Sequence, residues 1–345
     1  MRPLPGRGSP CPWAGHAASG PRCICFFRQH KEATTARKNT RGKLGYEFGV
    51  QFQLHSMMLT GLLLMIMFNV VPLFGLLLAF KNYKVTSGIV GIFTSPWYGF
   101  QNFKIIFSNH DFGNMIKNTL GINLIGQLVS IPLTIILALF INEIPHEPMR
   151  NTVKTVTYMP HFVSWVVFGT IVINLLTSDG VVNKLLLALG ALDNPVVFMA
   201  KADYFWTISI VSSLIKEIGW GTILYTAAIS GVDTTLYEAA EIDGAGRYRK
   251  MWYITLPTIK GTIVIMLIFA VAGIMNNNFD QIYVLQNSFN LERSEVIDTY
   301  IYKVGLQQLQ FGVASAINIF KSAIALALLF TANFVSRRLT DSGLF

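Results

Sequence analysis

Charged side chains are scarce in this chain. Only 13% of its 345 residues are Asp, Glu, Lys or Arg, about half the share of a typical soluble domain. Hydrophobic residues make up 52%, and the mean hydropathy is +0.48. So little charge cannot cover the surface of an ordinary soluble globule, and the composition predicts an integral membrane protein.

Residues for metal or covalent chemistry are also scarce. The three cysteines, Cys11, Cys23 and Cys25, all lie in the first 25 residues, so their spacing predicts neither a disulfide framework nor a metal site. No His/Cys/Asp cluster has metal-ligand spacing, and no Ser/His/Asp set is placed as a nucleophilic site. The phosphate-binding pattern G-x-x-x-x-G-K-[ST] does not occur. We therefore expect neither an enzyme nor ATP hydrolysis by this chain.

Long apolar runs are what the sequence has instead. A helix that spans a bilayer needs about 20 apolar residues, and six windows qualify: Ser56–Phe80, Asn118–Ile141, Val153–Leu176, Phe205–Ile229, Thr262–Val284 and Val313–Val335. Pro160 and His161 interrupt the third window, and 276–278 interrupt the fifth. The alternation of a membrane barrel is absent. The predicted fold is an all-α bundle of six transmembrane helices.

Positive charge is concentrated at the N-terminus. Residues 1–54 carry nine basic and two acidic side chains, whereas the rest of the chain has a net charge of only +2. The high pI therefore does not indicate nucleic-acid binding. Residues 1–44 are rich in Pro, Gly, Arg and Cys, and no apolar run of signal-peptide length follows the basic start. We interpret them as a disordered tail or a mis-started translation, and 45–345 as one membrane domain.

The distribution of Lys and Arg around the helix ends sets the expected orientation. Basic residues before the first window favour a cytoplasmic N-terminus, and six crossings then place the C-terminus there too. The predicted cytoplasmic segments are 142–152, 230–261 and 336–345. The predicted outer loops are 81–117, 177–204 and 285–312.

The polar stretch YEAAEIDGAGRYRKMWYITLP lies between two apolar windows, at 237–257. Just before it, Asp233, Thr234 and Thr235 are residue types that begin helices. Thr235 and Glu238 have the spacing of a capping box. The pattern predicts a short helix that begins near 235.

A glycine turn and a second helix follow. Gly244 or Gly246 can end the first helix, residues 247–253 can form the next, and Pro257 can open the following segment. The loop could be a plain solvated connector. Two alanines behind a glutamate, with a turn at a fixed distance, instead favour a surface that docks onto a partner.

The spacing Glu238-Ala239-Ala240, Gly244, Ile254-x-Leu256-Pro257 resembles the EAA loop of ABC-importer permeases. The loop residues assigned by this resemblance are Glu238, Ala239, Ala240, Asp243, Gly244, Ala245, Ile254, Leu256 and Pro257. Four more stretches, YMPHFVSWVV, KEIGWGTILYTAAISGVD, VIDTYIYKVGLQQLQFG and SRRLTDSGLF, resemble the maltose-type carbohydrate group. Within that group the chain is most similar to the polysaccharide and complex-oligosaccharide branch.

The resemblance implies a type I ABC-importer permease of a bacterial plasma (inner) membrane. The loop would be a cytoplasmic coupling helix, in which Glu238 contacts a basic residue of an ATPase subunit. Glu238 could instead only cap the helix from Thr235. The implied partners are a second, related permease, two ATPase subunits that use ATP and Mg, and an extracytoplasmic sugar-binding protein. This chain itself would bind no cofactor and no metal.

Four ionisable residues fall in or near the apolar windows. Lys216, Glu217, Asp280 and Lys321 sum to zero charge, so they could pair with one another, or a lysine could line the substrate path. Cations would suit uronate sugars, and aromatic or amide side chains would suit neutral ones. The candidates for the path are Lys216, Trp220, Tyr225, Asn276, Asn277, Asn278, Gln281 and Lys321.

Other functions stay open at this point. The same loop serves permeases for peptides, amino acids and polyols. A secondary transporter would have inverted repeats and matching broken helices, and a membrane enzyme would have a catalytic cluster. Neither feature is visible in the sequence.

Overall fold

The computed structural model describes residues 51–340, so the predicted tail 1–44 lies outside the described residues. The chain divides by its internal contacts into two units that meet between Pro72 and Leu73. The second unit carries nearly all of the described helices and every site discussed below.

The described residues form helices joined by loops and turns, and the β-type pairing among them is one isolated bridge between Lys81 and Trp97. Its first helix is Gln51–Phe80, which contains α2 (Val71–Leu73). The other α-helices are α3 Gly91–Thr94, α4 Gln101–Phe107, α5 Phe112–Asn142, α6 Glu147–Tyr158, α7 Trp165–Leu175, α8 Val181–Ala188, α9 Phe205–Ser230, α10 Thr234–Ile242, α11 Arg247–Lys250, α12 Leu256–Thr258, α13 Lys260–Ala272, α14 Phe279–Leu285, α15 Leu291–Ser294, α16 Ile297–Tyr302 and α17 Phe311–Thr340. The 3-10 helices are Phe74–Phe80, Val85–Ser87, Met159–Phe162, Phe198–Ala200 and Ala202–Tyr204. The π-helices are Ile66–Val70, Met251–Thr255 and Lys303–Gln307.

Three helices in the described residues are long and apolar enough to cross a bilayer: Gln51–Phe80, Phe112–Asn142 and Phe311–Arg338. The number rises to five if each of two bent helix pairs is one span. The predicted six spans are therefore not confirmed in number. The fourth predicted span forms the long helix α9, but its Ser209, Lys216 and Thr222 are polar and buried. These polar residues face neighbouring helices and not lipid. They make α9 less apolar overall than a helix that is exposed to lipid on all sides.

The third predicted span is wrong as a straight helix. The segment Glu147–Phe162 meets α7 at 94°. Pro160 lies in the last turn before the bend, where it cannot donate to a helical carbonyl. Ser164 then caps α7 by accepting a hydrogen bond from the backbone N–H of Val167.

The fifth predicted span is also wrong as a continuous helix. Helix α13 ends at Ala272, and α14 begins only at Phe279. Residues 273–278 between them are not helical, so Asn276 and its two neighbours lie in a break rather than in mid-helix. Asn278 caps α14, because its side chain accepts a hydrogen bond from the N–H of Gln281.

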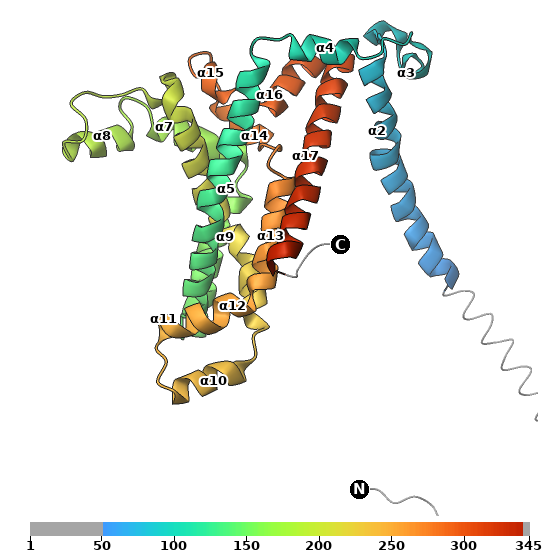
Figure 1. Ribbon diagram of the computed structural model, residues 1–345. Coiled ribbons are helices and arrows are strands. Elements are labelled where there is room, and N and C mark those ends of the chain that lie inside the picture. The colour runs from blue at the N-terminus through green and yellow to red at the C-terminus, as the bar shows by residue number, and fades with distance from the viewer. Residues whose placement is uncertain (1–50, 341–345) are drawn as a thin grey trace, which may run out of the picture. The chain divides into compact units, whose positions relative to one another are not determined.

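Helices α5 and α9 pack side by side, as do α13 and α17 (Figure 1). Glycines permit the closest approaches. A Cβ on Gly121 of α5 would lie 2.3 Å from the ring of Trp206 on α9, and one on Gly219 of α9 would lie 2.0 Å from the Thr157 carbonyl oxygen of α6. The buried core then consists of aliphatic clusters between these helices.

The loop helices α10 and α11 lie at one end of the second unit, and α4, α8 and α15 lie at the other (Figure 1). The predicted cytoplasmic loop 230–261 and parts of the three predicted outer loops therefore lie at opposite ends of this unit.

Candidate functional site

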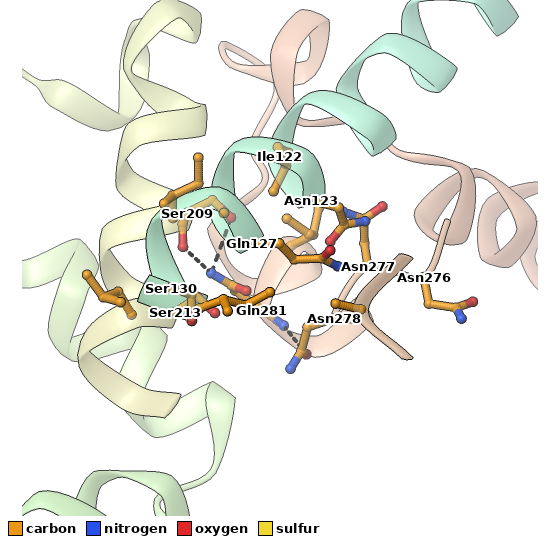
Figure 2. A pocket seen from close by; sticks show the side chains of 16 residues that line it. Ile122, Asn123, Gln127, Ser130, Ser209, Ser213, Asn276, Asn277, Asn278 and Gln281 are labelled. Carbon is orange, nitrogen blue, oxygen red and sulfur yellow. Dashed lines mark hydrogen bonds between the residues drawn. The ribbon is translucent and has the colours of Figure 1, made fainter. Parts of the chain in front are cut away.

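A polar cavity of about 290 Å³ lies where α5, α9 and the break between α13 and α14 meet. Its lining is rich in amides and hydroxyls and contains no charged side chain. The polar residues in its wall are Asn123, Gln127, Ser130, Ser209, Ser213, Asn276, Asn277, Asn278 and Gln281 (Figure 2). Such a wall can donate and accept hydrogen bonds with hydroxyl-rich molecules.

Hydrogen bonds to α5 and α9 fix the break that forms one side of this cavity. Gln281 donates from Nε2 to the Ser209 carbonyl oxygen at 2.6 Å and to the Ser212 hydroxyl at 3.1 Å. Asn123 donates to the Ile274 carbonyl oxygen at 2.8 Å. Backbone groups released by a helix break need such partners when no water is available. The side-chain oxygen of Asn277 is buried and has no hydrogen-bond partner within residues 51–340, so it can accept a hydrogen bond from a ligand.

A second cavity of about 360 Å³ shares Asn276 with the first. It lies between the break and α17, and its wall includes Asn318, Lys321 and Ser322. Lys321 forms an ion pair with Asp298 of α16. Lys321 therefore pairs with a residue outside the set of four ionisable residues, and Asp280 of that set is exposed at the start of α14.

The other intramembrane lysine lies at the 94° bend. Lys216 is only 3% exposed and donates to the His161 carbonyl oxygen at 2.6 Å. It also lies 3.4 Å from the carboxylate of Glu217, which bonds the His161 ring at 2.6 Å. Trp220 stacks on that ring at a centroid distance of 4.2 Å. Of the four ionisable residues expected either to pair with one another or to line the path, Lys216 and Glu217 therefore form a pair.

Five of the eight predicted path residues line the two cavities: Asn276, Asn277, Asn278, Gln281 and Lys321. Lys216, Trp220 and Tyr225 do not, because the first two belong to the bend cluster and Tyr225 is buried in an aliphatic cluster.

Sequence reasoning missed the cavity residues of α5. Asn123, Gln127 and Ser130 follow one another at helical spacing, which puts them on one face of the helix. This polar stripe inside an apolar window was the signal available.

The polar loop 230–257, which the sequence predicts to dock onto a partner, contains a helix cap at Asp233. The Asp233 carboxylate accepts a hydrogen bond from the backbone N–H of Thr235 at 2.9 Å, and this bond lowers the pKa of Asp233. The predicted capping box of Thr235 and Glu238 is therefore wrong. Helix α10 begins at Thr234, one residue earlier than expected, because Asp233 is the cap.

Gly244 ends α10 in the left-handed region, with φ +73°. The N–H of Ala245 donates to the Ala240 carbonyl oxygen at 2.8 Å, and the N–H of Gly244 donates to that of Glu241 at 3.0 Å. This pair of bonds is the Schellman motif. Of the two glycines considered as the stop, Gly244 is the correct one.

The outer face of the loop is available to a partner. Glu238 is exposed, its carboxylate has no ion pair or hydrogen bond among the described residues, and Ile242 is 88% exposed. Glu241 bonds the amine of Lys250 at 2.6 Å, and this bond lowers the Glu241 pKa. The inner face is anchored by a hydrogen bond of 2.9 Å between the hydroxyls of Tyr237 and Thr255.

Proteins of known family resemble this chain over most of its length. Protein LplB of Bacillus subtilis (strain 168) is 39% identical over 293 residues, which are 85% of this chain and 91% of the relative. The polygalacturonan/rhamnogalacturonan transport system permease protein YteP of the same organism is 36% identical over 91% of this chain and 97% of its own.

Solved structures agree with these relatives. A chain from a bacterial ABC transporter involved in the import of the acidic polysaccharide alginate superposes with a TM-score of 0.76. It is 35% identical and covers 86% of this chain and 99% of its own. A chain from a bacterial alginate ABC transporter in complex with an alginate pentasaccharide-bound periplasmic protein gives 0.75 at 36% identity.

The family model for binding-protein-dependent transport system inner membrane components matches residues 130–341, which include the loop, the second cavity and most of the lining of the first. The chain therefore belongs to this family of ABC-transporter permeases, which are multi-pass transport subunits and not enzymes.

Proposed function

We propose that this chain forms half of the translocation path of an ATP-driven importer for oligosaccharides or polysaccharide fragments, uronate-containing ones included. The observation that carries the proposal is the cavity lined by amides and hydroxyls at the break between α13 and α14. Sugars present many hydroxyl groups, and such groups bind where donors and acceptors converge on a concave wall. The names of the polygalacturonan and alginate relatives support a carbohydrate cargo.

The loop 230–257 would bind the ATPase subunit. An exposed, unpaired carboxylate at Glu238 and the exposed side chain of Ile242 lie on a short helix that is capped at both ends. A rigid helix can transmit the movement of a bound partner to α9 and α13, which flank the loop. ATP and Mg would be used by that partner.

This assignment orients the chain. The end with α10 would face the cytoplasm, together with both termini, and the end with α4, α8 and α15 would face the extracytoplasmic binding protein. A second, related permease would complete the path, and two ATPase subunits would bind to the two loops. The membrane would be a bacterial plasma (inner) membrane.

The test is sugar-stimulated ATPase activity. The chain would be co-purified with its cognate permease, ATPase and binding protein, and reconstituted in lipid. Oligogalacturonates and neutral oligosaccharides would then be compared, with peptides and polyols as other cargoes. Stimulation by sugars alone supports the proposal. Stimulation by a peptide or a polyol, with no response to any sugar, overturns the cargo.

A charge reversal tests the loop separately. Glu238→Lys should abolish ATPase binding and transport while the chain remains in the membrane. Glu147→Lys, at an exposed glutamate that begins α6, is the matched control and should keep both. Normal uptake by the Glu238 variant would contradict the role of the loop.

A further inference from the structure

The Asp298 carboxylate joins two parts of the cavity wall. One of its oxygens accepts a hydrogen bond from the backbone N–H of Asn277 at 2.9 Å, within the break between α13 and α14. The other oxygen pairs with the amine of Lys321 on α17. Side chains of this pair are 17% and 12% exposed. One partly buried carboxylate therefore holds the break and the neighbouring helix at the same time.

Lys321 is the one charged side chain in the walls of the two cavities that share Asn276. While Asp298 is paired with it, the wall has no net charge. A charge held in a partly dry site acts much more strongly than one in water. The pairing therefore decides whether a cargo meets a neutral wall or a cationic one.

We propose that Asp298 is a positioning and specificity-determining residue of the transport path. Its carboxylate fixes the break through Asn277 and cancels the charge of Lys321, so that carboxylate-bearing sugars are not retained on a bare cation as they pass. The inference rests on the proposed carbohydrate function, and it deepens that function by naming the element that sets the charge preference.

The charge preference can be measured with two probes that share one sugar backbone. Trigalacturonic acid and its fully methyl-esterified form differ in charge but not in sugar sequence. The readout is the apparent KM for ATPase stimulation of the full reconstituted complex, expressed as the KM for the ester divided by the KM for the acid. Each variant uses the same binding protein, so the selectivity of that protein cancels between variants.

Asp298→Asn leaves Lys321 unpaired, and we expect the ratio to rise about tenfold, the effect of one modest charge pair. Lys321→Gln leaves the carboxylate unpaired, and the ratio should fall below that of the wild type. The double variant removes both charges and should return the ratio toward the wild-type value. If Asp298→Asn fails to assemble, the other two variants still decide the question.

A matched control lies on the same segment. Glu295 pairs with Lys303 at 3.2 Å, and neither residue lines the two cavities. Glu295→Gln should leave the ratio unchanged. Equal ratios in the wild type, Asp298→Asn and Lys321→Gln would overturn the inference while the carbohydrate function stands. A wild-type complex that responds to neither probe nor to any other sugar would overturn the carbohydrate function, and the inference with it.

Discussion

The backbone of Gly244 offers a sharp test of the loop, because its φ angle has the opposite sign to that of nearby Gly246. Both glycines have open space where a Cβ would lie. Gly244 has φ +73° at the end of α10, whereas Gly246 has φ −68° and caps α11. Serine is a preferred cap at the second position and a strained residue at the first.

The expected magnitude follows from this difference. An L-residue in the left-handed region costs roughly 1–2 kcal/mol, which lowers the population of the intact motif by a factor of about 5–30. The Schellman bonds set the direction in which the chain leaves α10. If the ATPase subunit binds only the intact loop, its affinity for Gly244→Ser should fall by up to the same factor, and Gly246→Ser should bind like the wild type.

The assay is the affinity of the purified ATPase subunit for the permease pair in lipid nanodiscs, measured for both serine variants. Gly244→Asn is a third variant, because asparagine tolerates the left-handed region better than serine does. The order of affinity should be glycine, then asparagine, then serine. Equal losses for both serine variants, or an asparagine variant weaker than the serine one, would refute the reasoning.

Three further predictions concern packing, the cavity and pH. Gly219→Ala places a methyl group against a carbonyl oxygen of α6 and should lower stability by about 1–3 kcal/mol, measured by thermal unfolding, whereas Gly113→Ala meets open space and should not. Gln281→Leu leaves three polar atoms of α9 without its amide, and we expect a loss of about 1–3 kcal/mol together with a weaker cargo response. Because its hydrogen bond lowers the Asp233 pKa, the cap should stabilise α10 above the pKa of the unfolded chain and be lost as pH falls through the folded pKa. Hydrogen exchange of the α10 amides checks this, with Asp233→Asn as a cap that does not titrate.

Apolar length was enough to predict the straight helices. The predicted windows at 118–141 and 313–335 lie inside α5 and α17, because an unbroken apolar run has few alternatives in lipid. Apolar length alone was not enough to predict the bent helices. Pro160 and the asparagines at 276–278 marked where the helices break, but the angle of 94° depends on packing between α6 and α9, which is not local in sequence.

The loop was predictable because its signals are local. Glycine in the left-handed region and the start of α10 near 235 are properties of a few neighbouring residues. The exact cap was missed because Asp233 and Thr235 are both good caps, and local chemistry alone does not choose between them. The cavity was only half predictable, since Asn123 and Ser209 reach it from helices far apart in the chain.

The intramembrane charges are easier to explain once the breaks are known. Each break exposes backbone groups that would cost several kcal/mol apiece if they were left unpaired in a bilayer. At the first break the Lys216 amine satisfies a carbonyl, and at the second the Asp298 carboxylate satisfies an N–H. Each ion then needs a counter-ion of its own, which Glu217 and Lys321 provide. The two pairs differ in one respect: Lys321 lines one of the two cavities described here, and Lys216 and Glu217 line neither. The Asp298–Lys321 pair therefore supports the broken helix and also lies beside a cavity that a cargo could enter. The same pair can serve both structure and selectivity.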